Sequence, residues 1–185
     1  MKLVAGTIAV LASAAAAFTV WIWEPWAETE EESPDPTELS DEFRGSACRQ
    51  FAGLAARIAA ADPSPLIFLR ELGRQAAGIR PPPRALGDLA RGGRNKLPGK
   101  GFVARFDDGT TGQARHFAGI AVATTFGGVA STRLISIFLR DDPAESADGR
   151  LTDEAISFAS QVLRGELELE EAPRWLLDHL CRRRP

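Results

Sequence analysis

The chain has 185 residues, with 22 basic and 25 acidic side chains and a formal net charge of −3. Leaving an apolar N-terminal segment aside, about 160 residues remain, which suits one domain with a substantial core. There are two cysteines and two histidines and no CxxC motif, which excludes the cysteine and histidine clusters of structural zinc sites.

The first 23 residues predict a membrane-spanning segment. An uncharged run extends from Leu3 to Trp23, and 21 helical residues at about 1.5 Å each cover the roughly 30 Å hydrocarbon core of a bilayer. Lys2 precedes this run and acidic residues follow it, which places the rest of the chain on the extracytoplasmic side. We therefore expect a single-pass anchor or, if cleavage follows Ala17, a secreted or periplasmic protein.

Charge is segregated along the rest of the chain. Residues 24–42 hold nine acids and no base, whereas residues 43–116 hold thirteen bases and five acids. Residues 24–35 are also short of apolar side chains, so they predict an extended, self-repelling spacer. The globular domain is expected to span residues 36–185.

Two helices are predicted at the start of this domain, over residues 36–61 and 65–78. Each begins with a capping residue followed by proline, Asp35 in the first and Ser64 in the second. Apolar side chains recur every three or four residues in both, and Gly78 marks the end of the second helix.

Residues 79–105, here called the basic segment, hold four prolines, five glycines and seven basic residues against one acid. Apart from a short helix around residues 84–91, this composition predicts a long loop, and such loops inside a compact domain are usually functional or mobile. One interpretation is an electropositive surface for an anionic partner, and the other is a solvated connector. The residues proposed to bind the partner are Arg80, Arg84, Arg91, Arg94, Lys96 and Lys100.

Four more helices are predicted, over residues 113–126, 131–140, 152–164 and 171–183. The first of them is almost wholly apolar or small, so it is expected to be buried on most sides and central. Gly127 and Gly128 separate it from the next helix. The chain is thus predicted to be all-α: a membrane-spanning or signal helix, then a bundle of about six helices with little or no sheet.

Cys48 and Cys181 lie near opposite ends of the predicted domain. In an oxidising compartment they predict one disulfide, and closing so long a loop is worth roughly 4–5 kcal/mol by chain-entropy arguments. The alternative is two separately buried thiols that behave as small hydrophobic groups.

The sharpest candidate site is the turn and helix start at residues 107–116, where Asp107, Asp108, Arg115 and His116 gather two carboxylates, a guanidinium and an imidazole. In a catalytic interpretation His116 is the general base, either aspartate fixes its tautomer, and Arg115 binds an anionic or carbonyl group of the substrate. In a structural interpretation His116 satisfies backbone carbonyls and Arg115 pairs with the aspartates. No nucleophile motif accompanies the set.

The sequence supports two functional hypotheses. The first is a non-catalytic, membrane-tethered module of the cell envelope that binds an anionic polymer, a lipid headgroup or a protein through the basic segment. The second is a cell-envelope hydrolase that uses His116 as its base. Neither involves a cofactor or a metal ion, and nucleic acid is not an expected partner because the basic segment lacks an aromatic platform for bases.

Overall fold

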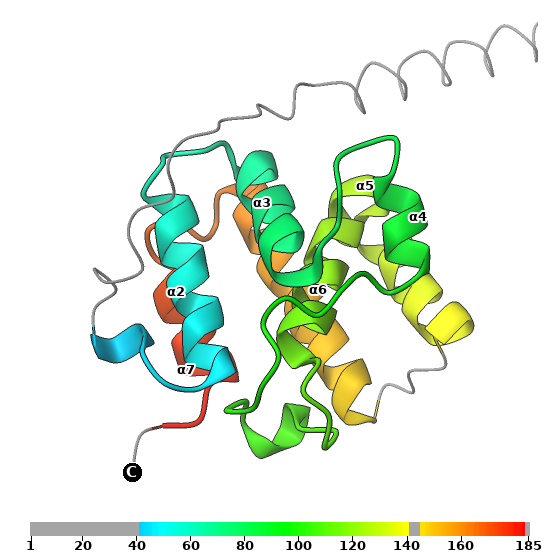
Figure 1. Ribbon diagram of the computed structural model, residues 1–185. Helices are drawn as coiled ribbons and strands as arrows, with labels where there is room; N and C mark the ends of the chain where they lie inside the picture. The colour runs from blue at the N-terminus through cyan, green and yellow to red at the C-terminus, as the bar shows by residue number, and fades with distance from the viewer. Residues whose placement is uncertain (1–40, 141–144, 184–185) are drawn as a thin grey trace, which may run out of the picture.

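The computed structural model describes residues 41–140 and 145–183, which form an all-α bundle (Figure 1). The six α-helices are α2 (Ala47–Ala59), α3 (Pro65–Ala77), α4 (Ala85–Ala90), α5 (Gln113–Arg140), α6 (Ala147–Arg164) and α7 (Ala172–Leu180). Two short 3-10 helices, η2 (Asp41–Phe43) and η3 (Ala104–Phe106), accompany them. The predicted all-α class is confirmed for these residues, while the predicted anchor (1–23) and spacer (24–35) lie outside them. Among the described helices, none combines the length and apolar composition that crossing a membrane requires.

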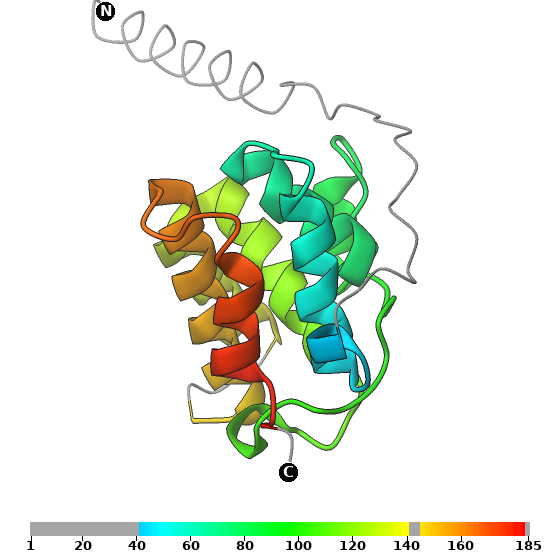
Figure 2. The same cartoon turned by 90° about the vertical axis from the view of Figure 1, so that its left-hand side faces the viewer.

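Helix α5 is central, as its apolar sequence predicts. It packs against α3 and α6, while α2 packs against α7 and α3 (Figure 1, Figure 2). The buried ring of Phe117 on α5 has its centroid 5.7 Å from that of Phe51 on α2, 5.4 Å from Phe158 on α6 and 6.5 Å from Trp175 on α7. Each buried phenylalanine contributes about 2 kcal/mol through the hydrophobic effect, so this cluster fixes how four helices meet.

The predicted ends of two helices are confirmed. Ser64 caps α3, because its Oγ accepts a hydrogen bond from the backbone N–H of Ile67 at 3.4 Å, and Pro65 takes the first helical position. Gly78 ends α3 and Gly165 ends α6, both in the left-handed conformation that glycine tolerates best.

The predicted first helix (36–61) is not continuous within the described residues, and its predicted start at Asp35-Pro36 lies outside them. Helix α2 begins at Ala47, and Phe43, which was expected inside the helix, belongs to η2. Gly45 has φ +111° and Ser46 is extended, so the backbone between the two elements cannot be helical. The apolar stripe after this point is buried as predicted, including Phe51 and Leu54.

Helices α6 and α7 also differ from the prediction at their ends. Helix α6 begins at Ala147 rather than Thr152, because Ser146 Oγ accepts the N–H of Gly149 at 2.9 Å and caps an earlier first turn. Leu163, an apolar residue inside the predicted helix over residues 152–164, is 39% exposed. Helix α7 ends at Leu180 rather than Arg183, because Cys181 is extended and forms an isolated antiparallel bridge with Phe102.

A break in α5 is confirmed at Gly128. This residue has φ +68° and ψ −179°, outside the helical region, so Gln113–Arg140 consists of two helical segments joined there. Thr132 Oγ1 donates to the carbonyl of Gly128 at 2.8 Å just after the break.

Candidate functional site

His116 is buried between α5 and α6, with an exposed fraction of 7%. Its Nε2 shares a 2.8 Å hydrogen bond with Oγ1 of Thr152, and its Nδ1 lies 3.8 Å from Oδ2 of Asp148. Both partners are on the N-terminal half of α6: Thr152 is the first residue of the helix that was predicted there, and Asp148 precedes that predicted start. The imidazole therefore connects two packed helices through side chains that sequence reasoning did not select.

The predicted aspartates are engaged elsewhere. Asp107 accepts the N–H of Gly109 at 3.0 Å and a guanidinium hydrogen bond from Arg182 at 2.8 Å. Asp108 accepts the N–H and the hydroxyl of Thr110, both at 2.8 Å, and the side-chain amide of Gln113. These bonds organise the turn before α5 in the manner of Asx turns, and neither carboxylate bonds the His116 ring.

Arg115, the fourth residue of the predicted site, does not contact the other three through a hydrogen bond or ion pair. Its side chain is half-buried beside Gly112, and it forms no hydrogen bond or ion pair within residues 41–140 and 145–183. The turn thus brings the four residues close in sequence but does not assemble them around one reacting centre.

The basic segment has an ordered backbone. Its middle part is attached to the C-terminal end of α3: the N–H of Arg94 donates to the carbonyl of Ala77 at 2.6 Å, and that of Lys96 to Ala76 at 3.1 Å. Gly93 lies so close to α3 that a Cβ on it would be 2.4 Å from the same Ala77 oxygen. Asn95 Nδ2 adds a 2.9 Å bond to the carbonyl of Thr111.

Part of the predicted cationic surface is neutralised internally. Arg80 donates from Nε at 2.9 Å and from Nη2 at 2.7 Å to the carboxylate of Asp88, which is 8% exposed, and Arg91 lies 3.8 Å from it. The hydrogen bonds from Arg80 hold the pKa of the Asp88 carboxyl well below its usual range. The charge of Arg80 is therefore largely compensated by Asp88, which makes Arg80 a weaker candidate for contact with an anionic partner.

The remaining predicted contacts are open to solvent. Arg84, Arg94, Lys96 and Lys100 are all exposed, and in the described part of the chain none of them pairs with a carboxylate. These four cations, rather than all six predicted residues, supply the accessible positive charge of the basic segment.

Cys48 and Cys181 form the predicted disulfide, with their Cα atoms 5.5 Å apart and both side chains buried. The bond joins α2 to the residue that follows α7, and disulfides of this kind are typical of domains that fold outside the cytoplasm. The end of the basic segment is fastened to the same place: Arg182 N–H donates to the carbonyl of Gly101, and Val103 N–H to that of Leu180, each at 2.8 Å.

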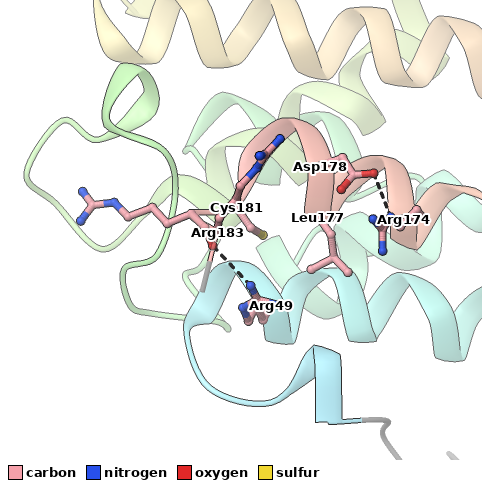
Figure 3. Close-up of a pocket in the computed structure, with 7 residues that line it drawn as sticks. Arg49, Arg174, Leu177, Asp178, Cys181 and Arg183 are labelled. Atoms are coloured by element: carbon pink, nitrogen blue, oxygen red, sulfur yellow. Dashed lines mark hydrogen bonds and ion pairs between the residues drawn. The ribbon is translucent and has the colours of Figure 1, made fainter. Parts of the chain in front are cut away.

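Beside the disulfide there is a cavity of about 270 Å³ that the sequence did not suggest. We call it the arginine pocket; it is lined by Arg49, Arg174, Leu177, Asp178, Cys181, Arg182 and Arg183. Figure 3 shows Arg49 extending from α2 towards the chain that follows α7, where it donates to the carbonyl of Arg182 at 3.4 Å. One feature of the sequence could have indicated this cavity: Arg49 and Arg182 each directly follow a cysteine of the predicted disulfide.

No cluster of three or more histidine, cysteine or acidic side chains suited to a metal ion occurs among the described residues. Comparisons of the chain with protein-family models, with curated proteins and with solved structures found no match.

Proposed function

We propose that the chain is an exported, membrane-tethered helical module of the cell envelope, and that its basic segment binds an anionic envelope polymer without catalysis. The tether is proposed from the uncharged run between Leu3 and Trp23. Export is supported by the same run and by the disulfide. The proposal for binding rests on one observation: Arg94, Lys96 and Lys100 present unneutralised charge from a backbone that is already fixed.

A fixed backbone matters because ordering a loop upon binding costs conformational entropy. Backbone ordering costs about 1–2 kcal/mol per residue, and the bonds from Arg94 and Lys96 to α3 meet that cost on folding. A connector that serves only to join α3 to α5 would not require them. Because the cations are spread along the segment, they suit an extended anion better than a small one.

The hydrolase alternative has less support. His116 is only 7% exposed, and its ring nitrogens face Thr152 and Asp148 on α6. A general base must reach a proton on a substrate, whereas this geometry favours a polar connection between α5 and α6. No observation in the described part of the chain adds a nucleophile or an open cleft at His116.

The test is binding of the full chain, kept in a non-ionic detergent, to dextran sulfate, with neutral dextran as the blank. We expect binding that weakens steeply above physiological salt, because exposed charges are screened within about 8 Å at that ionic strength. The variant Arg94→Gln/Lys96→Gln/Lys100→Gln should bind about tenfold more weakly, at roughly 0.5 kcal/mol for each cation.

The matched control removes three arginines that are ion-paired in the structure, Arg44→Gln/Arg74→Gln/Arg164→Gln. It changes net charge equally and leaves three acids unpaired, so simple charge counting predicts an equal loss. A loss confined to the basic-segment variant supports the proposal. Equal losses, salt-independent binding or no binding would overturn it, and binding only to phosphatidylglycerol vesicles would reassign the partner to lipid.

A further inference from the structure

We propose that residues 24–40, here called the acidic segment, lie along the basic segment when no polymer is bound and compete with the polymer for the same cations. This inference rests on the function proposed above and adds regulation of the same site. The acidic segment holds seven acidic side chains and no basic one, whereas the basic segment holds seven basic side chains and one acid. Opposite charges in such similar numbers attract each other wherever the chain allows them to meet.

The basic segment passes directly beside the place where the chain enters the domain. A Cβ on Gly99 would lie 2.8 Å from the Cβ of Ala47, the first residue of α2, and a Cβ on Gly101 would meet the side chain of Ser46. Figure 1 shows this part of the chain, in green, running past the N-terminal end of α2. Lys100 lies between the two glycines and is exposed. One accessible cation is thus next to the residues that connect to the acidic segment.

The acidic segment is long enough to reach the other cations as well. Its 17 residues can span at most roughly 55–60 Å, whereas the six steps from Arg94 to Lys100 cover at most about 22 Å. Contact would also relieve the repulsion among Glu30, Glu31 and Glu32, which follow one another in the sequence. Both the reach and the charge of the segment therefore suit it to the basic segment.

The covalent connection favours this contact over contact with a separate anion. Two partners joined by a short stretch of chain meet at an effective concentration on the order of millimolar. Main-chain bonds from Arg94 and Lys96 to α3 hold the basic segment in place, so its cations need no rearrangement to receive the acids. Surface ion pairs are individually weak and are screened by salt, so a densely charged polymer can displace the acidic segment. The contact therefore sets a threshold of polymer charge density rather than closing the site.

The direct test is zero-length carbodiimide cross-linking of the full chain in non-ionic detergent, which joins a carboxylate to an amine only where the two are in contact. Lysine side chains occur only at Lys2, Lys96 and Lys100, and the last two belong to the basic segment. Mass spectrometry should find monomeric protein in which residues 24–40 are linked to Lys96 or Lys100, and far less of it at high salt. Links only between separate chains, or none from residues 24–40, would overturn the proposal.

Competition is tested by the binding of dextran sulfate to the variant Glu30→Gln/Glu31→Gln/Glu32→Gln. The variant should bind about fivefold more tightly than the wild type, because three surface ion pairs no longer compete with the polymer. Each substitution keeps the shape of the side chain, so the effect reports charge alone. An unchanged affinity would show that the acidic segment does not compete for the site and would also overturn the proposal.

The matched control removes three exposed acids that precede α7, in the variant Glu168→Gln/Glu170→Gln/Glu171→Gln. It changes the net charge equally and should alter the affinity for dextran sulfate less than twofold. Equal tightening by both variants would mean that only total charge matters, against the proposal. Intrachain links without any polymer binding by wild type or variant would leave the contact standing and refute the function proposed above.

Discussion

The basic segment and the arginine pocket both carry positive charge, but the chain assembles them differently. The basic segment has its seven basic residues in one stretch of sequence, on an open surface held by main-chain bonds to α3. The pocket collects arginines from residue 49 and from residues 174–183, in a hollow fixed by a disulfide. The first is visible as composition, whereas the second exists only after folding. Composition also overstates the accessible positive charge of the basic segment, because Arg80 is neutralised by Asp88.

Removing the disulfide should affect the arginine pocket but not the basic segment, and it should cause the largest loss of stability. Cys48 and Cys181 are 133 residues apart, so the variant Cys48→Ala/Cys181→Ala should lose roughly 4–5 kcal/mol of unfolding free energy by chain-entropy arguments. Hydrogen exchange at the Arg182 amide, which lies at the pocket, should become faster, because the covalent link between α2 and the residue that follows α7 is then lost. Dextran sulfate binding should largely remain, because Arg94 and Lys96 are bonded to α3.

Urea unfolding, hydrogen exchange and dextran sulfate binding measure these effects on the same preparation. Hydrogen exchange at the Arg94 and Lys96 amides reports the basic segment even if the variant is only marginally stable. Unchanged exchange at the Arg182 amide, or a stability loss below about 1 kcal/mol, would show that the disulfide does not hold the pocket.

The opposite perturbation is Gly93→Ala, which should disturb the basic segment alone. Gly93 has φ +67°, and a Cβ there would lie 2.4 Å from the carbonyl oxygen of Ala77. The left-handed backbone and the clash together should cost about 3 kcal/mol of stability and displace the bonds from Arg94 and Lys96. Dextran sulfate binding should therefore weaken while hydrogen exchange at the Arg182 amide is unchanged.

Gly109→Ala separates backbone strain from the clash. Gly109 has φ +84°, but nothing lies within 4 Å of the position its Cβ would take. This variant should cost only about 1 kcal/mol and leave dextran sulfate binding intact. Equal destabilisation by the two substitutions would mean that the close approach of Gly93 to α3 contributes nothing to how the segment is held.

The elements that sequence predicted well depend on local chemistry. Ser64, Pro65 and Gly78 set the ends of α3 through bonds and φ values that involve only neighbouring residues. The start of α2 was missed because Asp35-Pro36 is a sound capping pattern, while the conformations of Gly45 and Ser46 decide where the helix begins. The start of α6 was missed because Ser146 lies inside a polar, acidic stretch that also suits a loop.

The candidate site was less predictable, because its contacts are set by helix packing. His116 meets Thr152, 36 residues away, only because α5 and α6 pack in one particular register. Asp107 and Asp108 are closer in sequence, but local hydrogen bonds to Gly109 and Thr110 engage them first. The disulfide was the exception among long-range contacts, since only one pairing of two cysteines exists.

Asp88→Asn is expected to lose less stability than Gly93→Ala and to change the accessible charge of the basic segment. Asp88 has its pKa lowered in the folded chain by hydrogen bonds from Arg80, so its stabilisation is present above the unfolded pKa of about 3.9 and disappears as pH falls. The variant should lose about 2 kcal/mol at pH 7 and show a flatter decline of stability below about pH 4. Urea unfolding from pH 7 to pH 3 measures both.

The same substitution releases Arg80 from its carboxylate and adds one accessible charge to the basic segment. Dextran sulfate should then bind about twofold more tightly even though the protein is less stable, because one exposed cation contributes roughly 0.5 kcal/mol. Arg80→Gln is the control: it breaks the same pair and lowers stability but adds no cation, so it should not tighten binding. If both variants bind the polymer alike, the internal neutralisation of Arg80 by Asp88 has no influence on the surface charge that the polymer meets. The basic segment would then act through its total charge and not through the placement of each charge.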